Sequence, residues 1–151
     1  MSPPRAQAPQ VALDPGILPT FLGYHVRRAQ VAIWRDFVRT VARGQIRPAL
    51  FSVLVLAEAN PGIAQIQLAQ QLAIDKASVV ALIDKLERAR LITRRRSTVD
   101  RRRQGLFIST LGARRLKVLK RDIARHERRF LDRLNAAEAR QLFRLLQRLY
   151  D

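Results

Sequence analysis

Two segments with helical periodicity are joined by only three residues, and this short connection restricts the folds open to the chain. Apolar residues recur every three or four positions in residues 63–72 and again in residues 76–88. Asp75 stands directly before the second segment, where its carboxylate can cap a helix N-terminus. The pattern is that of a helix-turn-helix, although a generic helical hairpin has the same pattern. The core face of the second helix is expected at Val79, Leu82, Ile83 and Leu86.

A pair of short strands with a basic loop between them is expected directly after the second helix. Residues 91–94 read as one strand, and residues 104–109 alternate as another. The loop belongs to the stretch RRRSTVDRRR, Arg94 to Arg103, which holds six arginines and one aspartate in ten residues. Alone, such a charge run is usually a solvated loop. Between two strands that follow a helix-turn-helix, it indicates a wing.

The rest of the chain is predicted to be mostly helical. The fold class is therefore mainly α, a winged helix-turn-helix with a two-stranded β wing and long N- and C-terminal helices. Residues 1–17, which include MSPPRAQAPQ, are expected to be a flexible leader, and residues 18–151 a single domain. The further helices are expected at residues 18–43, 49–58, 110–134 and 136–150.

A strong excess of positive charge points to a polyanionic partner. The 151 residues contain 29 Lys and Arg against 12 Asp and Glu, a formal net charge of +17. Nucleic acid is the first candidate. Residues 111–151 alone carry 12 basic and 5 acidic residues. Because one DNA-facing patch does not require charge along the whole chain, a second anionic partner is worth considering.

The composition excludes several other classes of protein. The chain has no cysteine, which removes disulfides and thiolate metal sites. Its longest apolar run, residues 49–57, is far shorter than the ~20 residues of a membrane span, so we expect a cytoplasmic protein without a membrane partner. With only His25 and His126 and no phosphate-cradling glycine loop, neither a catalytic site nor a metal or cofactor site is predicted. His126, among arginines, is expected at the surface or at an interface.

The chain resembles the MarR (multiple antibiotic resistance regulator) family of winged helix-turn-helix transcription factors from residue 18 to its C-terminus. The matching segments are QLAQQLAIDKASVVALIDKLERARLITR, the tripeptide Asp100-Arg101-Arg102 and ISTLG at residues 108–112. The resemblance implies a homodimer in which residues 18–45 and 111–151 interlock. It also implies that residues 46–110 form the DNA-binding part and that two recognition helices read a pseudo-palindrome.

The resemblance also implies which residues contact double-stranded DNA. Arg102 is the candidate for insertion into the minor groove, where a narrow groove favours arginine, with Asp100 fixing its direction. Lys76 and Ser78 stand in the first turn of the recognition helix. The family usually has glycine where Arg90 stands, so that turn is expected to differ. Further candidates for phosphate contacts are Lys85, Arg94, Arg96, Arg101 and Arg103, of which those at 94–96, 101 and 103 are alternatively internal partners of acids such as Asp84.

Family members commonly bind a small anionic or aromatic effector near the first helices. Residues 22–30, LGYHVRRAQ, also look like a branch of the family that answers to aromatic acyl-coenzyme A thioesters. Such a ligand carries phosphates, which would account for basic charge outside the DNA-binding face. The alternative is that these aromatic side chains belong to the core. The effector-binding candidates are Tyr24, His25, Arg28, Trp34 and Phe51.

A ligand-responsive homodimeric repressor, released from its operator by a small aromatic or acyl-coenzyme A effector, is the function that these features favour. The alternative is a general or architectural nucleic-acid-binding protein without an effector, against which Asp100 argues because it removes charge. The last helix carries an apolar stripe for dimerisation, although the stripe could also pack within its own chain. The stripe consists of Leu142, Leu145, Leu146, Leu149 and Tyr150.

Overall fold

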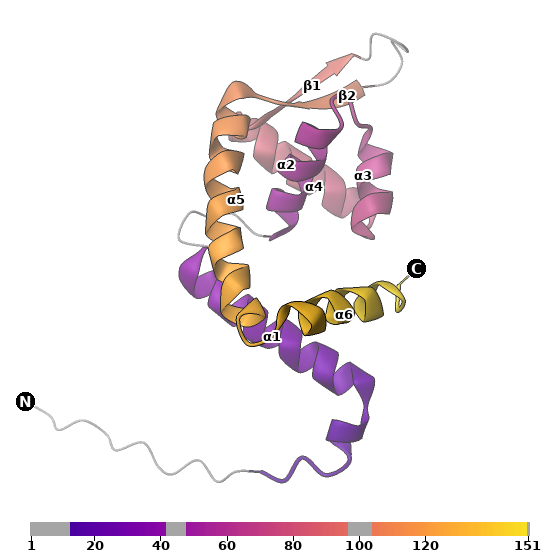
Figure 1. The fold of residues 1–151 in the computed structure, drawn as a ribbon. Helices are drawn as coiled ribbons and strands as arrows, with labels where there is room; N and C mark the ends of the chain where they lie inside the picture. The colour runs from indigo at the N-terminus through magenta and orange to yellow at the C-terminus, as the bar shows by residue number, and fades with distance from the viewer. Residues whose placement is uncertain (1–12, 42–47, 97–103, 151) are drawn as a thin grey trace, which may run out of the picture. The chain divides into compact units, whose positions relative to one another are not determined.

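The computed structural model describes residues 13–41, 48–96 and 104–150 (Figure 1). The chain divides into two compact units, Met1–Trp34 and Arg35–Asp151. The described residues form a mainly helical chain with one two-stranded sheet, as the sequence predicts. The elements are a 3-10 turn at Leu18–Thr20, α1 (Leu22–Thr40), α2 (Pro48–Ala59), α3 (Gln65–Leu72), α4 (Lys76–Arg88), β1 (Ile92–Arg96), β2 (Gln104–Ile108), α5 (Thr110–Leu131) and α6 (Ala136–Gln147).

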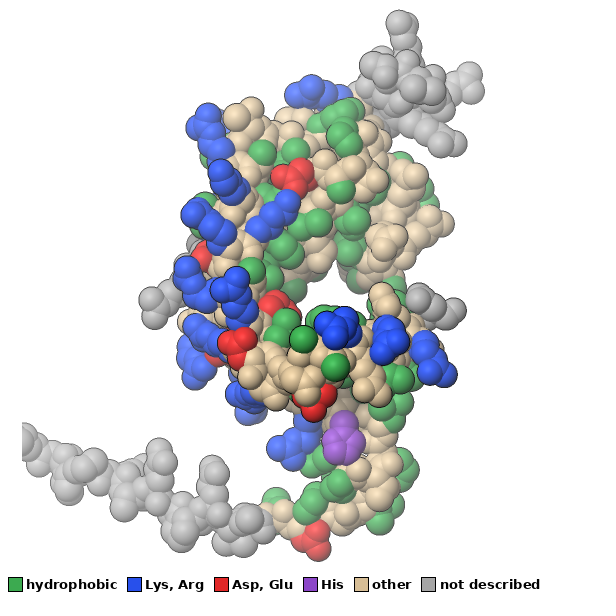
Figure 2. All heavy atoms as spheres, viewed as in Figure 1, with side chains coloured by type: hydrophobic (Ala, Val, Ile, Leu, Met, Phe, Trp, Pro, Cys, Tyr) green, Lys and Arg blue, Asp and Glu red, His purple; other side chains and the backbone are tan. Residues whose placement is uncertain are grey.

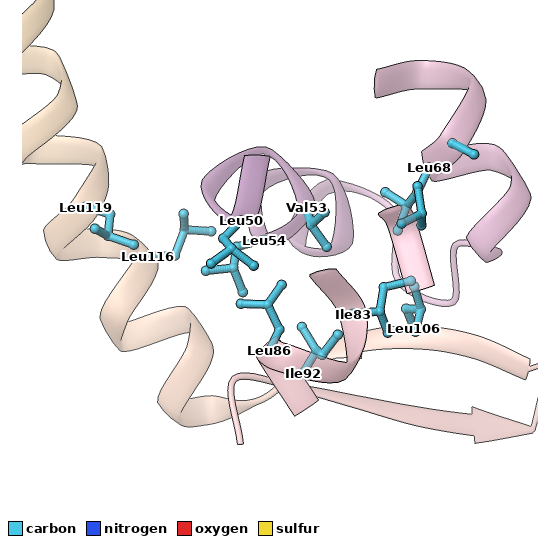
Figure 3. Packing of buried hydrophobic residues seen from close by; sticks show 12 residues of the cluster. Leu50, Val53, Leu54, Leu68, Ile83, Leu86, Ile92, Leu106, Leu116 and Leu119 are labelled. Atoms are coloured by element: carbon cyan, nitrogen blue, oxygen red, sulfur yellow. The ribbon is translucent and has the colours of Figure 1, made fainter. Parts of the chain in front are cut away.

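One apolar core holds the second unit together. Side chains from α2, α3, α4, both strands and α5 meet in it, because each of these elements places its apolar positions on one side (Figure 3). Val53, Leu54 and Ile83 are fully buried at its centre. The remaining buried members are Leu50, Leu68, Ala69, Val79, Leu86, Ile92, Leu106, Leu116 and Leu119.

The connection between α3 and α4 is the turn that the sequence predicts. Ala73 ends α3 with φ 50°, a left-handed conformation that turns the chain sharply. Asp75 then caps α4, since its Oδ1 accepts a 2.8 Å hydrogen bond from the amide of Ser78. The predicted bounds of this helix are confirmed. Of its predicted core residues, Val79, Ile83 and Leu86 are buried and Leu82 is partly buried.

The wing is an antiparallel pair that is joined at its base to the start of α3. Ile92 pairs with Ile108, and Arg96 pairs with Gln104. Leu106 also exchanges backbone hydrogen bonds with the segment before α3: it accepts from Gly62 at 2.9 Å and donates to Ile63 at 3.0 Å. Glycine at 105 permits this approach, because a Cβ there would lie 2.8 Å from the Cα of Gly62.

The turn after α4 keeps its shape without a glycine. Arg90 adopts φ 57°, and the amide of Leu91 donates to the carbonyl of Leu86 at 2.9 Å, as in a helix that ends in a left-handed residue. At Arg90 the chain therefore differs from the family in the type of residue, while the backbone has the left-handed conformation that usually favours glycine. An arginine here bears the steric cost that glycine avoids.

Several predicted helix ends differ from the structure. The expected helix over residues 18–43 is interrupted, because Phe21 is extended (φ −99°, ψ 130°) between the 3-10 turn and α1. The expected end of the following long helix at residue 134 is wrong, since α5 ends at Leu131 and Asn135 caps α6 through the amides of Ala137 and Glu138. The last helix ends at Gln147 instead of residue 150.

No single helix in the described ranges is both long and apolar enough to cross a membrane, and the one pair that reaches the required length and composition together, α3 with α4, is bent by 114°.

Candidate DNA-binding surface and effector-site residues

The face of α4 opposite the core is open to solvent. Lys76, Ala77, Ser78, Ala81 and Lys85 are exposed, whereas Val79, Ile83 and Leu86 face the core and are buried. The helix therefore has one side fixed to the domain and one side free for a partner, which is the arrangement that a recognition helix needs.

The two candidate contacts in the first turn of α4 have different surroundings. The hydroxyl of Ser78 donates a 2.6 Å hydrogen bond to Oδ2 of Asp75, so it is engaged in the helix cap. This bond, together with the one from the Ser78 amide, lowers the pKa of Asp75 from its usual value. Lys76 is exposed, and no acid in the described residues pairs with it. Lys76 is therefore the more available of the two for a base edge or a phosphate.

Arg94 ties the base of the wing to α4. Its two guanidinium nitrogens bind the carboxylates of Asp84 and Glu87, and its backbone amide donates to Glu87 Oε1 at 3.2 Å. The side chain is 21% exposed, and its pKa is raised, chiefly by the hydrogen bond to Asp84 and also by the nearby charge of Glu87. The sequence leaves two roles open for Arg94, and these contacts are those of the internal partner of acids. Any contact of Arg94 with DNA stays a prediction.

The other wing residues divide into a described stem and a tip outside the described residues. Arg95 is exposed, with its guanidinium 5.4 Å from the centre of the Phe107 ring. The backbone of Arg96 completes β1, and its side chain is outside the described part. Asp100, Arg101, Arg102 and Arg103 also lie outside it, so their roles at the DNA stay predictions.

Three effector-site candidates form one cluster near the start of α1. Arg28 donates a 2.7 Å hydrogen bond to the hydroxyl of Tyr24, and its guanidinium lies 5.5 Å from the centre of that ring. Tyr24 and His25 meet edge to face at 5.4 Å, and His25 Nε2 lies 2.7 Å from the carbonyl oxygen of Pro19. His25 and Arg28 are exposed, and Tyr24 is partly exposed. Aromatic surface and fixed positive charge are thus available together.

The remaining two effector-site candidates lie elsewhere. Trp34 is 45% exposed at the end of the first unit. Phe51 lies on α2 in the second unit, where it is partly buried against the core. The alternative that aromatic residues serve the core therefore applies to Phe51 more than to Tyr24 or Trp34.

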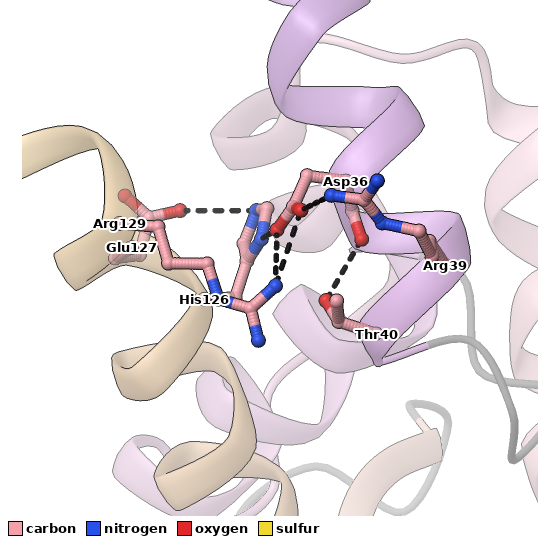
Figure 4. A network of polar contacts seen from close by, with 6 residues as sticks. All are labelled: Asp36, Arg39, Thr40, His126, Glu127 and Arg129. Carbon is pink, nitrogen blue, oxygen red and sulfur yellow. Dashed lines mark hydrogen bonds and ion pairs between the residues drawn. The ribbon is translucent and has the colours of Figure 1, made fainter.

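A buried polar network between α1 and α5 was missed by the sequence reasoning (Figure 4). His126 is 2% exposed, and its Nδ1 lies 2.9 Å from Oδ2 of Asp36, which is itself 8% exposed. The expectation that His126 lies at the surface or at an interface is therefore wrong. Arg129 reaches the same carboxylate at 3.1 and 3.2 Å, and Arg39 binds it at 2.6 Å.

The surroundings of Asp36 keep its carboxylate ionised. The hydrogen bond from His126, followed by that from Arg39, lowers the pKa of Asp36 to about 2, against the opposing effect of burial. Since an ionised carboxylate only accepts hydrogen bonds, Nδ1 of His126 is the donor. The rings of Phe37 and Phe130 pack edge to face on the imidazole at 5.6 and 5.4 Å. The partners are 90 residues apart in the chain, and no local pattern connects them.

The predicted dimerisation stripe on α6 and the turn after it is exposed. Leu149 is 58% exposed and Tyr150 75%, and the neighbouring Phe143, which the sequence reasoning missed, is 49% exposed. Among the described residues, the stripe is not buried within its own chain, in contrast to the alternative. The other three members are also exposed, namely Leu142, Leu145 and Leu146.

Taken together, a capped helix-turn-helix with one free face, followed by a two-stranded wing, defines the winged helix-turn-helix class of DNA-binding proteins. The MarR family model matches residues 46–103, which include α2, α3, α4 and β1. A protein of Thauera aromatica, a candidate transcriptional regulatory protein for the hcr operon, is 37% identical over 130 residues, which cover 85% of this chain and 78% of that protein. The chain belongs to the MarR family.

Solved structures of the transcriptional repressor CouR are similar to this chain over nearly its whole length. CouR bound to a 23-mer DNA duplex matches with a TM-score of 0.87 and 37% identity, covering 93% of this chain and all of CouR. CouR bound to p-coumaroyl-CoA matches with a TM-score of 0.82 and 36% identity, covering 91% of this chain and 97% of CouR. These relatives are transcriptional regulators and not enzymes, in agreement with the prediction that this chain has no catalytic site.

Proposed function

We propose that the protein is a homodimeric transcriptional repressor that binds a pseudo-palindromic DNA site and releases it when an aromatic acyl-coenzyme A thioester binds. The observation that carries the proposal is the geometry of α4, whose inner face is buried in the core and whose outer face is free. A regulator of this class works in the cytoplasm, where its operator is accessible.

The DNA-binding part of the proposal rests on the alignment of α4 with the wing. The contacts of Arg94 with Asp84 and Glu87 fix the strands against the recognition helix, so both elements can meet one duplex together. Lys76, and Ser78 if its hydroxyl leaves the cap, would face base edges or phosphates in the major groove. Arg102, oriented by Asp100, would enter the minor groove. Lys85, Arg96, Arg101 and Arg103 would contact phosphates.

The dimeric part of the proposal rests on the exposed apolar stripe of the last helix. Leu142, Leu145 and Leu146 are 38% to 47% exposed, and such a surface is stabilised when a second copy covers it. A two-fold axis between the copies would present two α4 helices to two half-sites, which is why a pseudo-palindromic operator is expected.

The effector part of the proposal draws on the likeness to CouR and on the residues of α1. An aromatic acyl group suits the partly exposed ring of Tyr24 and the exposed ring of Trp34, and Phe51 is the further candidate for an apolar contact. The phosphates of coenzyme A suit cations such as Arg28, with His25 beside it. For release, the ligand must bind the DNA-free conformation more tightly than the DNA-bound one.

The proposal can be tested by fluorescence anisotropy with the duplex upstream of the protein's own gene. We expect salt-sensitive binding that exceeds binding to a shuffled duplex by at least about 10³-fold. Addition of p-coumaroyl-CoA should release the duplex, whereas p-coumarate or coenzyme A at the same concentration should release a smaller fraction of it. Equal affinity for both duplexes without any thioester effect would instead favour the architectural alternative. Release by p-coumarate but not by p-coumaroyl-CoA would be consistent with the repressor function and would contradict the proposed thioester effector.

A further inference from the structure

A second basic surface, separate from α4 and the wing, runs along α5. Its members are spaced by three or four residues and therefore lie on one face of the helix. In Figure 2 the blue side chains follow the length of α5 at the left of the molecule. We call this the α5 stripe, and it consists of Arg114, Lys117, Arg121, Arg125 and Arg128.

The α5 stripe points away from the protein. The opposite side of α5 packs into the domain through Leu116, Leu119 and His126, which are buried. All five members of the stripe are exposed, and the side chain of Arg125 is 75% exposed. The stripe is thus the solvent side of a helix whose other side is fixed.

Within the described residues, the positive charge of the α5 stripe is left mostly uncompensated. The two acids of α5, Asp122 and Glu127, each stand one residue from a stripe arginine and are turned about 100° away from it. Asp122 reaches Arg125 at 3.8 Å. The other four members have no acidic partner in the described residues. By contrast, the off-face cations Lys120 and Arg129 bind Glu58 and Asp36.

Like charges at these spacings repel along the helix, so the stripe weakens α5 unless an anion relieves the repulsion. From Arg114 to Arg128 it extends about 21 Å at ~1.5 Å per residue. Duplex DNA carries about one negative charge per 1.7 Å, or about 12 over that length. A straight, convex row of cations matches such a linear polyanion better than a small anion, which requires groups that converge on it.

We propose that the α5 stripe is a second docking surface for the phosphate backbone of duplex DNA, independent of sequence. The stripe starts one turn beyond Ser109, where β2 ends, and α5 leads away from the wing (Figure 1). It can therefore hold a second duplex, or a distant part of the same DNA, while α4 and the wing hold the first. This also accounts for five of the 12 basic residues after position 110, which recognition by α4 does not require.

The test uses three variants of the full-length protein. R121Q/R128Q removes two charges from the stripe, and R121K/R128K keeps them. R140Q/R144Q removes the same number from exposed positions of α6. Because Gln and Lys are good helix formers, the fold is retained, which circular dichroism and size-exclusion chromatography verify. The readout is the number of short random-sequence duplexes bound per dimer, measured by sedimentation velocity over a range of salt concentrations.

We expect the wild type, R121K/R128K and R140Q/R144Q to bind more than one duplex per dimer at low salt, and R121Q/R128Q to bind one. A single duplex on the wild type would overturn the proposal, as would equal losses in R121Q/R128Q and R140Q/R144Q. Stripe-dependent binding to phosphatidylserine vesicles without any to the second duplex would overturn it as well.

The inference is separable from the proposed function. If the protein shows no preference for its operator, but R121Q/R128Q still loses the additional random-sequence duplex, the proposed function is wrong and the inference about the α5 stripe is supported. If operator binding and thioester release are intact but no second duplex is held, the reverse is true.

Discussion

The imidazole of His126 donates from Nδ1 to Oδ2 of Asp36 across 2.9 Å and so joins α5 to the C-terminal half of α1. Both residues are buried, and Arg39 and Arg129 complete the surroundings of the carboxylate. In the second unit, this hydrogen-bonded contact complements the apolar core, to which α1 contributes little. A ligand that binds to α1 would therefore bind to a helix that this pair connects to α5.

Replacing His126 by alanine should lower the free energy of unfolding by about 2–4 kcal/mol. The imidazole is in contact with Phe37 and Phe130, and its loss leaves a void as well as a carboxylate with one donor fewer. Urea unfolding at fixed protein concentration measures the change. His25→Ala is the matched control, since His25 is exposed and should change stability by less than about 0.5 kcal/mol. Equal effects of the two variants would contradict the role given to the buried pair.

Acid should remove the contribution of Asp36 in a defined pH range. Because the pKa of Asp36 is about 2 in the folded chain against 3.8 for the free group, its stabilising effect is complete above pH 3.8. The effect is lost as pH falls from 3.8 towards 2. The difference in unfolding free energy between wild type and Asp36→Asn should therefore shrink as the pH falls below 4. A difference that stays constant down to pH 2.5 would show that the carboxylate is not held ionised.

Arg90→Gly should stabilise the protein by roughly 0.5–1 kcal/mol. Arg90 has φ 57°, a conformation that is costly for a side-chain-bearing residue and free of strain for glycine. Thermal unfolding would show a higher midpoint for Arg90→Gly and no gain for Arg90→Ala, which keeps a Cβ. A gain of the same size in both variants would mean that the arginine side chain, and not the backbone, is the source of the strain.

Gly112→Ala should prevent normal folding, or lower stability by more than about 3 kcal/mol. A Cβ at this position would lie 2.0 Å from the carbonyl oxygen of Leu91, where α5 passes the start of the wing. Gly23→Ala is the control, since nothing lies within 4 Å of its Cβ position. In the helical α1 it should add up to about 1 kcal/mol. Soluble expression and thermal unfolding compare the two, and a well-folded Gly112→Ala would refute this packing.

Arg94 and Arg102 should separate stability from DNA affinity. Arg102→Ala should weaken operator binding about tenfold or more and leave the melting temperature unchanged, since a groove contact of this kind contributes roughly 1–3 kcal/mol. Arg94→Ala should lower the unfolding free energy by about 1 kcal/mol, because its partly exposed pairs with Asp84 and Glu87 are lost. An Arg94→Ala variant with full stability and weakened DNA binding would assign Arg94 to the DNA instead.

The sequence was most informative where structure is determined locally. The bounds of α4 follow from Asp75 and from the apolar spacing after it, and both operate within a few residues. The interruption at Phe21 and the early end of α5 have no equally strong local pattern. The Asp36–His126 pair lies beyond sequence reasoning, because the chain must fold before residues 90 positions apart can meet. Arg94 is an intermediate case. The sequence indicates both an internal acid such as Asp84 and a DNA phosphate as possible partners, but it does not decide between them.

The backbone exchange between Ile63 and Leu106 has a mechanical consequence. The segment that leads into α3 acts as a short third member of the sheet, so the stem of the wing cannot hinge without breaking hydrogen bonds next to the helix-turn-helix. The stem, α3 and α4 are therefore expected to move together. In the proposed dimer, a ligand that alters DNA binding would therefore reorient each helix-turn-helix together with the stem of its wing, and it would change the separation of the two α4 helices and not the reach of either wing.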